Sequence, residues 1–230
     1  MHTTQGKLIV LEGTDGSGKS VQTHLLLERL QKEGHRATTL SFPQYGKKSS
    51  GPVEEYLNGK YGPADHVNPY AASLFYAIDR FDIARELGAR LTEGYVVVAD
   101  RYVDSNAAHQ GGKIRDPEER ERFIEWLYDI EYRILEIPKP DLVIILHVPA
   151  IIGQKLVAQK RQRFYLEKGA TRDAHEADLE HLRNAEVTYL WLAARHLETH
   201  RVIECVKNDT LMTPEAIHQR IWEVAVKILK

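Results

Sequence analysis

The sequence predicts an α/β protein built on a five-stranded parallel sheet with helices on both faces. Short apolar runs such as LIVL at 8–11 and LVIIL at 142–146 have the length and composition of strands buried on both faces. Longer segments with helical apolar spacing separate these runs, and this alternation is typical of a parallel sheet. In addition, the first apolar run leads directly into a glycine-rich loop that opens a helix.

The first half of the chain predicts two strands and three helices. After the strand at 8–11, residues 21–33 carry a leucine stripe, and Gly34 is a natural helix stop. Residues 36–42 are expected to form the second strand. Residues 43–68 are rich in glycine and proline, so we expect a lid- or pocket-type excursion with one short helix near 53–57. A long helix is predicted from Pro69 to Thr92, closed by Gly94.

The second half predicts three more strands. The strand at 95–99 ends at Asp100 and precedes a short helix over 103–112. Asp116 caps the next helix, with a proline in its first turn, and Pro138 breaks it. The strand at 142–146 is followed by a basic segment. The last predicted elements are a helix at 173–199, a strand at 202–206 and a helix that begins at the cap Thr213 and runs nearly to Lys230.

Composition indicates an ordinary globular protein. Of its 230 residues, 43% are hydrophobic and 28% are charged, which suffices for a full core. The formal net charge of −2 argues against a nucleic-acid-binding surface, and no apolar run approaches membrane-spanning length. The lone Cys205 excludes a disulfide framework. We expect a single cytoplasmic domain over residues 1–230 without nucleic-acid or membrane partners, although the length would also permit two domains.

The octapeptide GTDGSGKS at 13–20 fits the pattern G-x-x-x-x-G-K-[ST] of a phosphate-binding loop, here called the phosphate loop. Its glycines let backbone N–H groups approach an anion, helped by the positive end of the following helix. Lys19 would neutralise β- and γ-phosphate charge, and the Ser20 hydroxyl would bind Mg²⁺. The alternative is an ordinary glycine-rich turn. The residues predicted to bind a nucleoside triphosphate are Gly13, Thr14, Asp15, Gly16, Ser17, Gly18, Lys19 and Ser20.

A second candidate cluster follows the strand at 95–99. Asp100 stands where a carboxylate would lie beside Mg²⁺ in a phosphate-loop enzyme. Arg101 and Tyr102 come next, at the carboxyl end of a parallel strand, where such sheets bind ligands. The alternative is a plain surface Asp-Arg pair.

Several stretches resemble the thymidylate kinase family. They are GTDGSGKS at 13–20, Phe42-Pro43, FYAIDR at 75–80, DRYVDSNAAHQ at 100–110, PKPDL at 138–142 and the basic segment before DAHE at 173–176. The match covers nearly the whole chain, and an Asp-Arg-Tyr motif followed by Ser-Asn is specific to this family among phosphate-loop kinases. The resemblance implies a nucleoside-monophosphate-kinase fold, ATP as phosphoryl donor with Mg²⁺, dTMP as acceptor and a homodimer.

The resemblance also implies roles for the acceptor side. Asp15 would accept a hydrogen bond from the acceptor 3′-hydroxyl, and Arg101 would hold the acceptor phosphate against the γ-phosphate. Tyr76 would stack on the pyrimidine and Arg80 would bind its O4, the alternative being an amphipathic helix with a core tyrosine and a surface arginine. The implied dTMP-binding residues are Asp15, Phe42, Pro43, Tyr45, Tyr76, Arg80, Arg101, Ser105, Asn106, His109 and Gln110. The implied metal residues are Ser20, Asp100 and Glu176.

The basic segment resembles the lid of the family, about 155–173, although a charge run is usually a solvated face. Some members place an arginine at the loop position of Gly16, whereas others have glycine there and a catalytic arginine in the lid. This chain resembles the second kind, so the implied catalytic residues are Asp15, Lys19, Arg101 and one of Arg161, Arg163 and Arg172.

Two departures from the family pattern concern the acceptor. Gln44 stands where relatives often have arginine, and His109 where many have tyrosine near the sugar 2′ position. The rival functions are a kinase for another deoxynucleoside monophosphate or a deoxynucleoside, a non-catalytic nucleotide-binding module, and a GTPase-type switch. The last would want an Asn-Lys-x-Asp motif, and the sequence has none.

Overall fold

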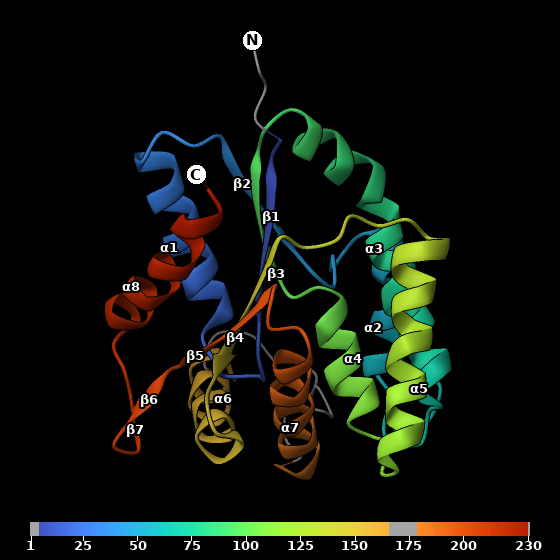
Figure 1. Cartoon of the computed structure of the whole chain (residues 1–230). Helices are drawn as coiled ribbons and strands as arrows, with labels where there is room; N and C mark the ends of the chain where they lie inside the picture. The colour runs from blue at the N-terminus through green and yellow to red at the C-terminus, as the bar shows by residue number, and fades with distance from the viewer. Residues whose placement is uncertain (1–4, 166–178, 230) are drawn as a thin grey trace.

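The computed structural model describes residues 5–165 and 179–229. Its centre is a parallel sheet in the order β2-β3-β1-β4-β5 (Figure 1). The strands are β1 (Lys7–Glu12), β2 (Ala37–Ser41), β3 (Val96–Asp100), β4 (Leu142–His147) and β5 (His200–Glu204). The predicted five-stranded parallel sheet is therefore confirmed. Because β1 lies in the middle, its residues after Lys7 are all buried, which explains a continuous apolar run in place of an alternating one.

Helices cover both faces of the sheet (Figure 1). They are α1 (Lys19–Lys32), α2 (Gly51–Leu57), α3 (Pro69–Thr92), α4 (Val103–Gly111), α5 (Pro117–Tyr128), α6 (Ala150–Tyr165), α7 (Leu179–Arg195) and α8 (Pro214–Ala225), with short 3₁₀ turns at Lys48–Ser50 and Val226–Ile228. One core cluster packs α3, α4, α5 and α7 against Leu8 and Val10 of β1. The opposite cluster packs α1 and α8 against Ile9 and Leu11 of the same strand.

The predicted caps form where the sequence places them. Asp116 accepts a hydrogen bond from the backbone N–H of Glu119 at 2.8 Å, and Thr213 accepts one from Ala216 at 3.3 Å. The long helix spans Pro69–Thr92, as predicted. None of the helices within residues 5–165 and 179–229 is long and apolar enough to cross a membrane.

Several element boundaries differ from prediction. The fifth strand was predicted at 202–206 but lies at 200–204, because the sheet ladder already begins where Val143 N donates to Thr199 O at 2.9 Å. For the same reason α7 ends at Arg195 and not at Thr199. A hairpin of β6 (Val206–Lys207) and β7 (Thr210–Leu211) takes up the rest of the predicted strand.

Two further differences concern helices. The helix starting at Pro117 does not run as one α-helix to Pro138, because it widens into a π-helix, η2, at Asp129–Ile134. Of the predicted lid, residues 155–165 belong to the helix α6, and residues 166–173 lie outside the described residues.

Candidate active site

The phosphate loop joins β1 to α1, and its glycines are required for different reasons. Gly16 has φ +84°, and a Cβ there would lie 2.5 Å from the carbonyl oxygen of Gly153 in α6. A Cβ on Gly13, at φ +138°, would lie 2.6 Å from Leu146 O. Gly18 has φ +86° but open space around it. Close packing and a left-handed backbone both demand glycine here.

Lys19 folds back over the loop. Its Nζ donates to the carbonyl oxygens of Gly13 and Thr14, each at 3.0 Å. Burial, reinforced by the charge of Arg101, lowers the pKa of Lys19 to about 8, against the opposing effect of Asp15. An anion bound in the loop would restore the full positive charge.

The loop also holds unpaired polar atoms. Among the described residues, the hydroxyls of Thr14 and Ser17 are buried without a hydrogen-bond partner. Buried polar groups are normally paired, so these atoms are free to meet a ligand or water. Ser20 is exposed at the start of α1, and Asp100 at the end of β3 lies close enough to act electrostatically on Lys19. An oxygen donor set of this kind fits Mg²⁺ beside a nucleotide phosphate.

Asp15, in the phosphate loop, and Arg101, directly after β3, form an ion pair with Oδ1 and Nη2 2.5 Å apart. Burial alone would raise the pKa of Asp15, but Arg101 and Lys19 outweigh it and hold that pKa far below its usual range. Arg101 has a left-handed backbone with φ 69°, and its N–H donates to Leu11 O at 3.0 Å. The structure thus brings these two predicted residues together.

The predicted residues on α4 have different surroundings. Asn106 donates to Ser73 O at 3.1 Å, while its Oδ1 and the Oε1 of Gln110 are buried with no partner among the described residues. The Nε2 of His109 lies 3.4 Å from the Nη1 of Arg101, and the His109 ring stacks on the ring of His181 in α7. The Ser105 hydroxyl donates instead to Glu12, a residue that the sequence analysis did not single out.

Arg80 is buried rather than exposed, so the alternative of a surface arginine on α3 is wrong. Its Nε lies 2.9 Å from Glu131 Oε2, its Nη2 also pairs with Glu131, and its Nη1 donates to Tyr102 O at 3.3 Å. The contact of Arg80 with a pyrimidine O4 stays a prediction. If it forms, the Arg80 guanidinium makes it while it is held in place by Glu131.

The remaining acceptor-side residues lie on α3 and in the segment that follows β2. Tyr76 is half-buried and meets Tyr56 edge to face, with ring centroids 6.2 Å apart. Tyr45 is exposed, whereas the ring of Phe42 is buried against Tyr102, so Phe42 belongs to the core. Pro43, which follows it, is half-buried.

The unusual Gln44 is part of the scaffold. Its backbone N–H donates to Asp79 Oδ2 and its side-chain amide to Asp79 O, both at 2.8 Å. This pairing ties the segment after β2 to α3.

The lid residues are only partly described. Arg161 and Arg163 lie on α6, and their side chains, together with Arg172 and Glu176, lie outside the described residues. Their predicted catalytic and metal-binding roles stay predictions.

Comparison with known proteins decides the family. The thymidylate kinase family model matches residues 11–209, which is most of the chain. The chain belongs to the thymidylate kinase family. A thymidylate kinase from Mycobacterium tuberculosis is 32% identical over 190 residues, covering 82% of this chain and 86% of that protein. The human thymidylate kinase is 30% identical over 216 residues, covering 94% of this chain and 92% of the human protein.

A solved structure supports the fold. The thymidylate kinase of Candida albicans superposes on this chain with a TM-score of 0.72 and 21% sequence identity, covering 98% of this chain and 94% of that one. At this identity the likeness concerns the fold. The predicted nucleoside-monophosphate-kinase-like fold and the predicted family are both confirmed.

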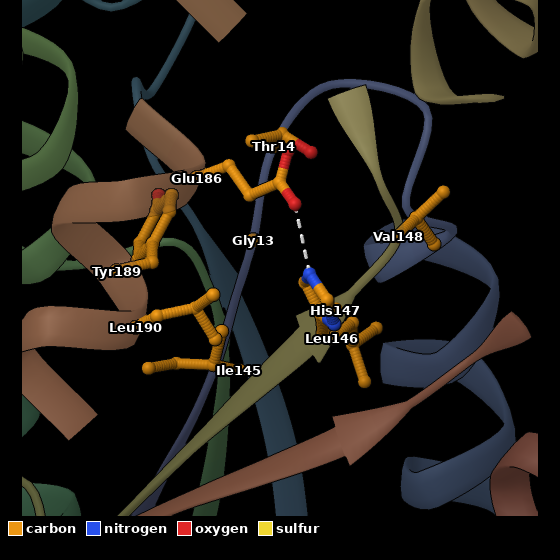
Figure 2. Close-up of a pocket in the computed structure, with 9 residues that line it drawn as sticks. All are labelled: Gly13, Thr14, Ile145, Leu146, His147, Val148, Glu186, Tyr189 and Leu190. Atoms are coloured by element: carbon orange, nitrogen blue, oxygen red, sulfur yellow. Dashed lines mark hydrogen bonds and ion pairs between the residues drawn. The ribbon is translucent and has the colours of Figure 1, made fainter. Parts of the chain in front are cut away.

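A small pocket lies beneath the phosphate loop of this thymidylate kinase family member, between β4 and α7 (Figure 2). His147, at the end of β4, bridges Glu186 at 2.9 Å and Glu204 at 2.7 Å. Glu186 also accepts the backbone N–H of Ala150 at 2.8 Å, at the start of α6. Both nitrogens of His147 therefore have partners, which suits a structural strand-end histidine, and Gly13 and Thr14 of the phosphate loop line the same pocket.

Proposed function

We propose that this chain transfers the γ-phosphoryl group of ATP to dTMP and releases ADP and dTDP. The observation that supports this most directly is the ion pair of Asp15, in the phosphate loop, with Arg101, between β3 and α4. Two phosphates that must meet repel each other, and a guanidinium held beside the donor loop can offset that repulsion. Family membership supplies the reaction, and this ion pair lies where the two substrates would join.

The donor side uses the phosphate loop. ATP phosphates would lie against the loop N–H groups and Lys19, with the Thr14 and Ser17 hydroxyls available to them. Ser20 and Asp100, with Glu176, would hold Mg²⁺. When bound, the ion neutralises charge on the phosphate oxygens, and the chain's own part is to orient it.

The acceptor side uses α4 and α3. On binding dTMP, Arg101 would leave its ion pair with Asp15 and pair with the acceptor phosphate. The Asp15 carboxylate would then accept a hydrogen bond from the 3′-hydroxyl group. Tyr76 would stack on the base. The carbonyl oxygens of Asn106 and Gln110, which have no partner among the described residues, suit the N3–H donor of thymine. Cytosine has no hydrogen on N3, so the same oxygens would disfavour it.

Three further proposals rest on the same family resemblance. Residues 1–230 form one kinase domain with a lid at about 155–173, and one of Arg161, Arg163 and Arg172 stabilises the transferring phosphoryl group. The protein acts in the cytoplasm.

We also propose a homodimer. Leu74, Ile78 and Phe81 on α3 are 41%, 51% and 52% exposed and recur at i, i+4 and i+7, so they form one apolar stripe. Contiguous exposed apolar surface of this kind favours association with a second copy of the chain.

The test is kcat/KM for dTMP, dUMP, dCMP and 3′-deoxy-dTMP on one preparation. We expect dUMP, which lacks only a methyl group, to lose about 10- to 200-fold. We expect dCMP to be worse, because its base cannot satisfy Asn106, Gln110 and Arg80 together. The 3′-deoxy acceptor should react slowly because Asp15 loses its partner. If dCMP matches dTMP, the chain is a kinase for another nucleotide.

A further inference from the structure

Helix α4 begins without a side-chain cap of its own. Its N-cap residue is Tyr102, whose side chain makes no capping hydrogen bond. The backbone N–H of Tyr102 donates to Oε1 of Glu12 at 2.7 Å, and that of Ser105 donates to the same oxygen at 3.1 Å. Carboxylates favour the positive end of a helix. Glu12, the last residue of β1, therefore caps a helix that lies about ninety residues later in the chain.

The second oxygen of this carboxylate is equally occupied. Oε2 of Glu12 accepts the Ser105 hydroxyl at 2.5 Å and the Tyr189 hydroxyl of α7 at 3.1 Å. Glu12 is fully buried, and burial, reinforced by Asp104, raises its pKa. Four hydrogen-bond donors converge on one buried acid, which is the condition under which such a group is tolerated.

The position of Glu12 joins the two halves of the site. The next residue, Gly13, opens the phosphate loop, while α4 follows Arg101 and carries Asn106 and Gln110. Arg101 itself has a left-handed backbone, a conformation that persists only where its surroundings enforce it. Its neighbours enforce it here, since Arg101 N donates to Leu11 and Tyr102 N to Glu12.

We propose that Glu12 is a positioning residue for phosphoryl transfer, whose buried carboxylate caps α4 and so aligns Arg101 and the acceptor-binding face of α4 with the phosphate loop. This inference rests on the proposed function, because it assigns the acceptor to α4. It requires hydrogen-bond geometry rather than net charge. An amide at this position could accept from the two backbone N–H groups through its oxygen and donate to the two hydroxyls through its nitrogen.

The test compares Glu12→Ala with Glu12→Gln in the full chain. In Glu12→Ala we expect kcat/KM for dTMP to fall about 10²-fold, the scale of a misplacement of about 1 Å, with a raised KM for dTMP. KM for ATP should change by no more than a few-fold, because the contacts of Lys19 with Gly13 O and Thr14 O do not involve Glu12. Glu12→Gln should stay within a few-fold of wild type for both substrates.

A merely structural role would give a different pattern. A smaller fraction of folded enzyme lowers the apparent kcat, because less active enzyme is present. It leaves KM for dTMP and KM for ATP unchanged. An unchanged KM for dTMP in Glu12→Ala would overturn the proposal, and so would a Glu12→Gln variant as impaired as Glu12→Ala. If Glu12→Ala does not fold, Tyr189→Phe serves in its place, because it removes one of the four hydrogen bonds to Glu12. This variant should also raise KM for dTMP, and an unchanged KM for dTMP would contradict the proposal.

Hydrogen exchange separates this inference from the proposed function. The amides of Tyr102 and Ser105 should exchange faster in Glu12→Ala than in wild type, while those of α1 should not change. This measurement needs no substrate. A wild-type protein that fails to phosphorylate dTMP would refute the proposed function alone, whereas unchanged exchange at Tyr102 and Ser105 would refute the cap.

Discussion

Replacing Gly16 with alanine tests why this chain has no arginine in its phosphate loop. A Cβ on Gly16 would lie 2.5 Å from the carbonyl oxygen of Gly153 and 3.1 Å from its carbon, so the loop and the start of α6 would have to separate. The contacting atoms are backbone atoms, which cannot rotate away as a flexible side chain can. Any side chain at position 16 meets the same obstacle.

The magnitude follows from two terms. A non-glycine residue in the left-handed region costs about 1–2 kcal/mol, and overpacking at a rigid contact adds about 1–3 kcal/mol. Gly18→Ala is the matched control, because Gly18 has nearly the same φ, +86° against +84°, but nothing within 4 Å of its Cβ position. The change in unfolded-chain entropy is the same for both variants and cancels in the comparison. We therefore expect Gly16→Ala to be less stable than Gly18→Ala by about 1–3 kcal/mol.

The assay is urea denaturation of wild type, Gly16→Ala and Gly18→Ala without nucleotide. If the two variants lose equal stability, the close approach of Gly153 does not restrict position 16 and the steric argument is wrong. A kinetic companion is Gly16→Arg. It should lose activity and not gain a catalytic arginine, because the Cβ of the arginine meets the same backbone atoms of Gly153.

Three other perturbations test the buried charges and the lid. ATP binding should take up about half a proton at pH 8, because bound phosphates return the pKa of Lys19 from about 8 to well above that pH. Calorimetry in two buffers of different ionisation enthalpy measures this proton uptake. Glu131→Gln should cost about 3–5 kcal/mol in urea denaturation, because it strips the partner from Arg80 in a fully buried pair. Alanine at one of Arg161, Arg163 and Arg172 should lower kcat by about 10³-fold or more, with a far smaller effect on ATP binding, because the contact forms mainly in the transition state.

Each of these has a control. Lys19→Arg keeps its charge at every pH and should bind ATP without the proton uptake, so equal uptake in that variant would exclude Lys19 as its source. Asp129→Asn breaks the exposed pair with Arg133 in the same π-helix and should lower the free energy of unfolding far less, so an equal loss in Glu131→Gln would contradict the buried-pair argument. Three lid variants that all keep normal kcat would refute the lid assignment.

Local signals in the sequence were enough for most of the fold. Short strand-like runs that alternate with helical segments predicted five parallel strands, and cap residues such as Asp116 predicted where helices begin. The phosphate loop was equally readable, because its glycines, Lys19 and Ser20 occupy one contiguous stretch of the sequence. Family membership came from motifs of the same local kind.

Tertiary structure alone decided which distant groups share a partner. No local pattern indicates that Glu131 occupies Arg80, fifty-one positions away, or that Glu12 receives a hydroxyl from Tyr189, one hundred and seventy-seven positions away. The Glu12 pairing depends on the strand order β2-β3-β1-β4-β5, which places the ends of β1 and β3 side by side. The Arg80 pairing depends on how α3 lies against the π-helix η2. Sequence spacing carries no information about that order. A buried carboxylate finds its partners through the packing of the whole sheet, because it must satisfy its hydrogen bonds with whichever donors the fold places beside it.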